Sequence, residues 1–186
     1  MIERLIVTSL PVLFLSLLYG NEIALRLRGR FSGGDPPIER ALFGCCKYGI
    51  VIPWGATVLS GWGVSYPALE TPGILRWPAL GFWFLGFVLL IMGRLGLGSA
   101  FRIGLAKEET RLRVGGIFRL SRNPMYLGID ATLVAAALYT LNPIVVAVGV
   151  FIGAVHHRII LVEEARLHSV FGQAYGAYCR SVRRYL

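Results

Sequence analysis

The chain has 186 residues, of which 55% are hydrophobic and only 16% are charged. In a water-soluble domain about a quarter of all residues are charged, so this composition argues against a soluble globular protein. The formal net charge is +9, but the basic residues lie in the gaps between apolar runs, as in membrane proteins, which argues against a nucleic-acid partner.

Five apolar stretches each have about the ~20 residues that are needed to cross the hydrocarbon core of a bilayer. In chain order they are residues 5–25, 42–59, 77–97, 124–141 and 143–162. The last two are joined by almost nothing, and Asn142-Pro143 is a turn signal, which predicts a tight helical hairpin. The predicted fold is therefore all-α, an integral membrane bundle of about five transmembrane helices.

Lysine and arginine residues predict the orientation of these spans. Of the 19 basic residues, all except Arg4 and Arg76 lie within or at the edges of three segments: those joining spans one to two and three to four, and the tail after span five. Alternating spans bring these three segments to one face, which the positive-inside rule makes cytosolic. The prediction is an N-terminus outside, a C-terminus inside, and a single membrane domain, 1–186, with three spans in 1–97 and a site-bearing half in 98–186.

The start of the fourth span carries the most informative stretch. Asparagine is favoured at the N-cap and proline at the first helical position, so Asn123-Pro124 should open a helix. Its free backbone N–H groups, together with Arg122, form an anion site, and Tyr126 follows on the first turn. The alternative is a plain helix start with a basic anchor and an interfacial tyrosine.

A pair of acidic residues, Glu163-Glu164, follows the fifth span at its predicted cytosolic end. The tight hairpin would place these carboxylates beside the start of the fourth helix, an arrangement that suits a zwitterionic ligand. The alternative is a solvated helix end, paired with Arg166. His156 and His157 are adjacent and point to different faces of a helix, so no metal site is expected.

Near the C-terminus, Phe171, Tyr175 and Tyr178 fall at positions i, i+4 and i+7, on one face of an amphipathic helix. Such a helix either lies on the cytosolic lipid surface or covers the base of a nucleotide-like cofactor. Small residues in Gly96-Leu97-Gly98, at the end of the third span, are more typical of close helix packing than of a ligand site.

Together these features resemble the isoprenylcysteine carboxyl methyltransferase and phospholipid N-methyltransferase superfamily of membrane methyltransferases. The resemblance covers roughly residues 93–185. It rests on five pieces in order: the Gly-rich turn before Phe118, the segment Arg122-Asn123-Pro124-Met125-Tyr126, the hairpin, the pair Glu163-Glu164, and Phe171-Gly172 followed by Tyr175.

The resemblance implies S-adenosylmethionine as cofactor at the cytosolic surface, no metal, and a lipid or other lipophilic small-molecule acceptor that enters from the bilayer. The residues that match the family's cofactor contacts are Thr110, Arg111, Leu112, Arg113, Phe118, Asn123, Pro124, Met125, Tyr126, Glu163 and Glu164.

The acceptor chemistry implied by the resemblance stays open between carboxylate O-methylation and lipid amine N-methylation. The carboxyl methyltransferases usually have His where this chain has Asn123, and the phospholipid branch has Asn. Their acceptor-orienting arginine falls on Ile159, so Arg158 beside it is one expected catalytic residue. Tyr126 is the other: an amine or phenol acceptor would require a base, for which Glu163, Glu164 and Tyr126 are the candidates.

Two other functions fit the same pattern. Sterol reductases share a related C-terminal architecture and bind NADPH, and the basic residues here could hold its 2′-phosphate. A non-catalytic lipid-binding protein could also retain the fold.

Overall fold

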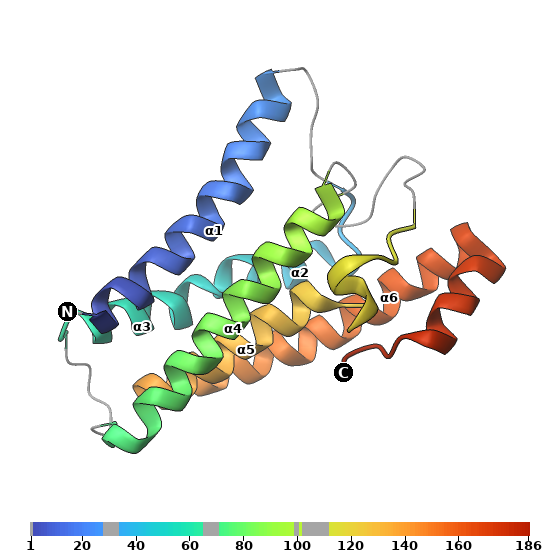
Figure 1. Ribbon diagram of the computed structural model, residues 1–186. Coiled ribbons are helices and arrows are strands. Elements are labelled where there is room, and N and C mark those ends of the chain that lie inside the picture. Colours follow the sequence, from blue (N-terminus) through green and yellow to red (C-terminus); the bar gives the residue numbers. More distant parts are fainter. Residues whose placement is uncertain (1, 28–33, 65–70, 99–100, 102–111) are drawn as a thin grey trace.

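The computed structural model describes residues 2–27, 34–64, 71–98, 101 and 112–186. Its described elements are helices, which confirms the predicted all-α class (Figure 1). In chain order they are α1 (Ile2–Leu27), α2 (Arg40–Gly49), α3 (Val51–Gly61), α4 (Gly73–Leu97), the short 3₁₀ helix η2 (Gly116–Arg119), α5 (Pro124–Thr140) and α6 (Pro143–Ser181). The two termini lie toward opposite ends of the bundle.

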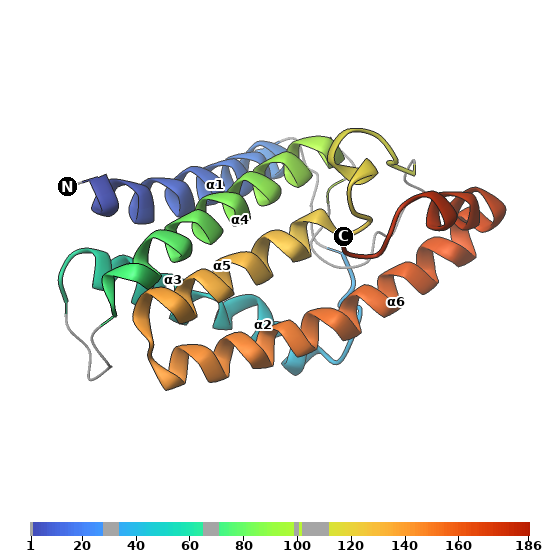
Figure 2. The same ribbon diagram turned by 60° about the horizontal axis from the view of Figure 1, so that its bottom comes forward.

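Four helical segments of the described chain are long and apolar enough to cross a membrane: Ile2–Gly20, Arg40–Gly61, Gly73–Leu97 and Pro143–Ser181. With its 17 residues, α5 is about 25 Å long and falls just short of a span, although it lies alongside α4 inside the bundle (Figure 2). The predicted set of about five transmembrane helices therefore consists of four candidate spans and α5.

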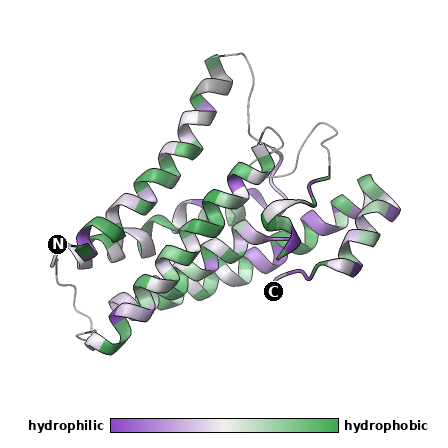
Figure 3. Cartoon of the chain, in the orientation of Figure 1, coloured by the Kyte–Doolittle hydropathy of each residue, from purple (hydrophilic) through white to green (hydrophobic). Residues whose placement is uncertain are grey.

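The outer surface of the bundle is apolar. Large side chains such as Ile74 and Trp77 are 80% and 70% exposed, a surface that water would not tolerate but lipid would. Coloured by hydropathy, the helices are mostly hydrophobic, and hydrophilic residues gather around the start of α5 and the C-terminal part of the chain (Figure 3). The chain is thus an integral membrane protein whose polar residues concentrate at one end.

The second predicted span is not one continuous helix but two, α2 and α3, which meet at Ile50. In an unbroken helix the ring of Pro53 would collide with the carbonyl of Gly49, four residues earlier. The break places Pro53 in the first turn of α3, where its missing N–H costs nothing. The Thr57 hydroxyl donates to the Pro53 carbonyl at 2.8 Å.

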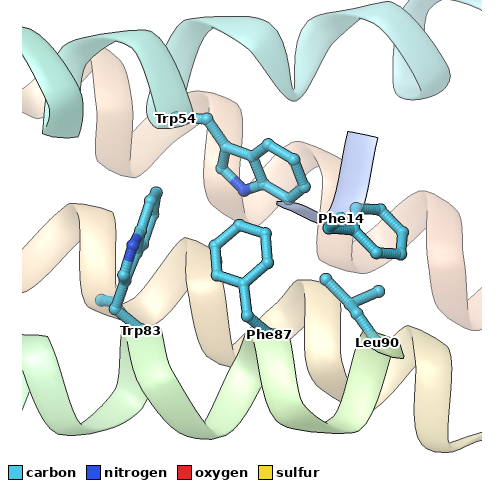
Figure 4. Close-up of a cluster of buried hydrophobic side chains, with 6 residues drawn as sticks. Phe14, Trp54, Trp83, Phe87 and Leu90 are labelled. Atoms are coloured by element: carbon cyan, nitrogen blue, oxygen red, sulfur yellow. The ribbon is translucent and has the colours of Figure 1, made fainter. Parts of the chain in front are cut away.

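An aromatic cluster joins α1, α3 and α4 in the middle of the bundle (Figure 4). The Phe87 ring centroid lies 4.8 Å from that of Trp54 and 5.1 Å from that of Trp83, in tilted and edge-on geometry. Trp54 also donates its indole N–H to the Thr132 hydroxyl of α5 at 2.9 Å. The cluster therefore packs α1 and α3 against α4 and, through Trp54, against α5, whose first residues lie at the polar end of the bundle.

The backbones of α4 and α5 cross in direct contact at two glycines. A Cβ atom placed on Gly86 would lie 2.7 Å from the Gly128 carbonyl oxygen, and one placed on Gly128 would lie 2.7 Å from the Gly86 carbonyl oxygen. Only glycine permits this approach, which is the way small residues bring membrane helices together. The crossing holds α5 in place beside α4.

The predicted hairpin between α5 and α6 is confirmed. Leu141 turns the chain with a left-handed conformation, φ 45°, and ends α5. The Asn142 side-chain oxygen then accepts from the backbone N–H groups of Ile144 and Val145 at 2.9 and 3.4 Å, and Pro143 opens α6.

The helix α6 continues far beyond residue 162, where its end was expected. Its straight part, residues 143–171, extends about 43 Å, so it leaves a hydrocarbon core of about 30 Å with about two turns to spare. At Gly172, where φ is 49°, the backbone is not helical and α6 kinks, and the predicted C-terminal amphipathic helix follows this kink. Glu163 and Glu164 therefore lie inside a helix, and the expected helix end at these residues was wrong.

Candidate functional site

The start of α5 is tied to the middle of α6 through Asn123. Asn123 occupies the N-cap position before Pro124, as predicted, but its side chain makes no capping hydrogen bond. Its amide nitrogen donates instead to Glu164 Oε1 at 3.1 Å and to the backbone carbonyl of Arg184 at 3.2 Å. The asparagine thus joins α5, α6 and the C-terminal tail.

The Glu164 carboxylate is the centre of a buried ion-pair network. Arg122 donates through Nε and Nη2 at 3.0 and 3.2 Å, and Arg184 donates through Nε at 2.9 Å. With three side-chain partners and only 10% of its side-chain surface exposed, this carboxylate is already neutralised. Glu164 therefore holds the site together and is not placed to receive a ligand.

Arg122 is held on every side. Its Nη1 donates to the carbonyls of Cys179 and Val182 at 3.2 and 3.1 Å, and its backbone N–H donates to Arg183 at 3.0 Å. Burial alone would lower the pKa of the guanidinium, but the hydrogen bonds and charge of Glu164 outweigh burial, so this pKa is raised. Arg122 stays a cation under all ordinary conditions.

Glu163 has a different partner from its neighbour, because successive helix residues point about 100° apart. The Tyr126 hydroxyl donates to Glu163 Oε1 at 2.8 Å. Among the described residues this is the group that hydrogen-bonds Glu163, so the half-buried carboxylate keeps acceptor capacity on Oε2. Of the two acids, Glu163 is the one that can bind a cationic or hydroxyl-bearing ligand.

A second polar pair lies one helical turn further along the same interface. His156 Nδ1 and Asp130 Oδ1 are 2.8 Å apart, and the imidazole is buried. The His156 ring packs edge-on against Tyr126, with centroids 5.1 Å apart. From the sequence, His156 was considered only as a metal ligand, and Asp130 was not predicted. The four-residue spacing of Tyr126 and Asp130, which puts both on one face of α5, is the signal that could have placed Asp130 here.

The C-terminal tail closes the polar end of the bundle. The Ser121 hydroxyl donates to the Arg184 carbonyl at 3.1 Å, and His157 Nδ1 lies 2.6 Å from the Tyr185 hydroxyl. In Figure 2 the tail runs back from the end of α6 to the start of α5. Neither Ser121 nor Arg184 was predicted, since contacts across some sixty residues leave no local pattern.

An aromatic cluster packs beneath the tail. Phe118 of η2 is buried with Tyr175 and Tyr178 of α6, and the Tyr178 hydroxyl donates to the Phe118 carbonyl at 2.6 Å. The Tyr175 hydroxyl is buried without a hydrogen-bond partner among the described residues. Phe171, the third residue of the predicted aromatic face, precedes the bend at Gly172 and packs against the edge of the cluster.

The glycine motif at the end of α4 serves close packing. A Cβ atom on Gly96 would lie 3.1 Å from the Phe118 ring, so the glycine lets η2 approach α4. Gly98 ends α4 with φ 53° and accepts a hydrogen bond from Arg94 Nη1 at 3.1 Å.

The remaining predicted cofactor contacts are distributed unevenly. Leu112 borders the aromatic cluster and Arg113 is exposed, whereas Thr110 and Arg111 lie outside the described residues. Pro124 is buried in the first turn of α5, and Met125 packs against Gly93 of α4.

Arg158 lies apart from Tyr126 and Glu163. It borders an open hollow of about 380 Å³ between the start of α2 and α6. The hollow is lined by Ile38, Glu39, Leu42, Arg158, Leu161 and Val162. Ile38 and Leu42 also pack against the buried hydrophobic cluster of α2, α5 and α6, against which Tyr126 packs too.

Across the part of the chain that the structure describes, no three His, Cys, Asp or Glu side chains come together to hold a metal ion. A family model described as phospholipid methyltransferase matches residues 76–174, just over half of the chain, from α4 to the bend in α6. No curated protein and no solved structure matches the chain.

Proposed function

Because the chain belongs to the phospholipid methyltransferase family, and is on that ground a membrane methyltransferase, we propose that it transfers a methyl group from S-adenosylmethionine to a lipophilic acceptor held in the bilayer. The transfer takes place at the polar end of the bundle, which the positive-inside rule, applied to the basic residues of the sequence, makes the cytosolic face. The N-terminus is then outside.

The observation that carries the proposal is the hydrogen bond from Tyr126 to Glu163 at 2.8 Å. It brings a half-buried carboxylate of α6 against the first turn of α5, where helix N–H groups favour an anion. A ligand with both an ammonium and a carboxylate would find a partner for each within a single small site.

The groups present fit S-adenosylmethionine. Glu163 offers an acceptor for an ammonium or a ribose hydroxyl. When bound, the cofactor supplies a methyl group on a positively charged sulfur.

The chain's own contribution is to position the reactants and exclude water. Holding two reactants in line converts a bimolecular step into a unimolecular one, which is worth up to about 7–11 kcal/mol. The network of Arg122, Asn123 and Glu164 fixes the site, and the tail covers it. The hollow beside Arg158 offers an apolar route from the lipid and a cation for an acidic group of the acceptor.

Calorimetry on the full chain in detergent tests the proposal against its two alternatives. We expect binding of S-adenosylmethionine and none of NADPH. Binding of NADPH alone would indicate a reductase, and binding of neither would indicate a lipid-binding protein. Transfer of labelled methyl groups to a membrane lipid extract then tests the reaction itself.

A matched pair of variants locates the site. Glu163→Gln should weaken S-adenosylmethionine binding, because a neutral amide replaces the carboxylate. Glu3→Gln is the control: Glu3 accepts from the Tyr139 hydroxyl at 3.2 Å in the same kind of pair, but near the N-terminus, at the opposite end of the bundle. Equal affinities for the two variants would contradict the placement of the site.

A further inference from the structure

The pair of buried His156 and part-exposed Asp130 has no part in the site as described so far. His156 comes from α6, which is long and apolar enough to span a membrane, and Asp130 comes from α5 beside it. Ionisable side chains among membrane-spanning helices are costly and rare, and where they occur they commonly mark a proton or substrate pathway. The pair therefore calls for a functional reason.

Its position relates it to the proposed methyl-transfer site. Asp130 follows Tyr126 by four residues on α5, about 6 Å deeper in the bundle, and the His156 ring touches the Tyr126 ring. Thus Glu163, Tyr126, His156 and Asp130 form a continuous row along the α5–α6 interface. The row begins at the polar end and runs along the helices into the bundle.

The orientation of the imidazole is fixed. Asp130 holds Nδ1 at 2.8 Å, which selects the tautomer with a proton on Nδ1 and leaves Nε2 with its lone pair. A carboxylate behind an imidazole also stabilises the imidazolium that forms when Nε2 takes a proton. The arrangement is that of a general base.

We propose that His156, oriented by Asp130, accepts the proton that the methyl acceptor must lose, so that the acceptor is a protonated amine or a phenol and not a carboxylate. The inference rests on the proposed methyl transfer. The proton passes from the acceptor's N–H or O–H to Nε2. The lone pair left behind forms the new bond to the methyl carbon, and the electron pair of the broken carbon–sulfur bond stays on sulfur.

Asp130 is a positioning residue in this scheme, since it acts through His156. The imidazolium and the Asp130 carboxylate form a neutral pair, so the proton can be held in an apolar environment until the product leaves and water returns. General-base help of this kind is worth about 10²–10⁴-fold in rate.

The test uses His156→Asn in the full chain in detergent. The Asn amide nitrogen takes the place of Nδ1, so the variant can keep the hydrogen bond to Asp130 while losing the base. We expect turnover with a membrane lipid extract to fall about 100-fold, with S-adenosylmethionine affinity by calorimetry unchanged. His168→Asn, an exposed histidine of the same helix, is the matched control and should behave as the unmodified chain.

The chemistry of the product is a second readout. Methyl esters release methanol in mild alkali, whereas N-methyl groups and phenol ethers do not. We expect the labelled product to resist alkali. Release of the label, or full turnover by His156→Asn, would overturn the inference while leaving methyl transfer intact.

Asp130→Asn is a second variant that tests the same proposal if His156→Asn does not fold. This variant retains an oxygen for Nδ1 and removes only the charge, so we expect kcat to fall about tenfold at unchanged KM for S-adenosylmethionine. A parallel loss of cofactor affinity, or an unchanged kcat, would show that the pair only ties α5 to α6. Failure of the unmodified chain to bind S-adenosylmethionine would instead overturn the proposed function.

Discussion

Arg122 and Glu164 meet in a two-pronged ion pair, Nε to Oε1 at 3.0 Å and Nη2 to Oε2 at 3.2 Å, that joins the segment before α5 to the middle of α6. Such forked pairs are the most directional contacts available to a carboxylate. They matter here because both side chains are about nine-tenths buried, at 11% and 10% exposed. Removing one partner leaves a buried charge without compensation.

Glu164→Gln should therefore lower the free energy of unfolding by about 3 kcal/mol, since Arg122 loses its counter-charge. Thermal unfolding in detergent measures the change. Arg184→Gln is the comparison: Arg184 pairs with the same carboxylate, but its side chain is 37% exposed, so the loss should stay below about 1 kcal/mol. Equal losses in the two variants would show that Arg122 does not depend on Glu164.

The Tyr126 hydroxyl gives a second prediction. Tyr126→Phe removes the donor that holds Glu163 and leaves the ring in place against His156. In this variant the Glu163 carboxylate must be ordered when the ligand binds, and this ordering costs binding free energy. We therefore expect S-adenosylmethionine affinity to fall about fivefold. Calorimetry gives the value, and Tyr139→Phe, which removes the hydroxyl bonded to Glu3, should leave it unchanged. Equal affinity before and after the Tyr126 change would mean that Glu163 needs no positioning.

The crossing of α4 and α5 is open to a direct test. Gly128→Ala forces a methyl group to within 2.7 Å of a backbone oxygen that cannot turn aside, so α5 must shift away from α4. Overpacking of this kind costs about 2 kcal/mol, read from the thermal midpoint in detergent. The control is Gly81→Ala on α4, where the added methyl group meets no atom within 4 Å and should change stability by less than about 0.5 kcal/mol. A neutral Gly128→Ala would show that the helices do not approach this closely.

Much of the fold could be predicted because hydropathy and turn chemistry are local. Apolar length located the spans, and Asn142-Pro143 located the hairpin, which its capping hydrogen bonds confirm. The end of α6 could not be found this way. Hydropathy shows where a helix leaves the membrane but not where the helix ends. The segment from Glu163 to Leu167 consists of strong helix formers, so α6 continues beyond the apolar span.

The site was predicted only in part, for a related reason. The hairpin brings Asn123 and Tyr126 of α5 against Glu163 and Glu164 of α6, as expected. The sequence did not reveal that two arginines donate hydrogen bonds to the Glu164 carboxylate. This leaves Glu163 as the carboxylate that can still accept a hydrogen bond from a ligand. The roles of these residues toward a cofactor stay predictions.

The C-terminal tail provides the last prediction, because it acts through its backbone as well as its side chains. Deleting residues 183–186 removes the carbonyls that accept from the Arg122 backbone N–H, the Ser121 hydroxyl and the Asn123 amide. We expect S-adenosylmethionine affinity to fall more than about tenfold, since several partners of the site are lost together, while the helical circular dichroism signal persists. Deleting Leu186 alone, which is 76% exposed, should have no effect. Arg184→Gln removes one side chain and keeps the backbone carbonyls, so it should weaken S-adenosylmethionine affinity far less than the deletion. An equal loss of affinity would show that the arginine charge, and not the backbone of the tail, is responsible.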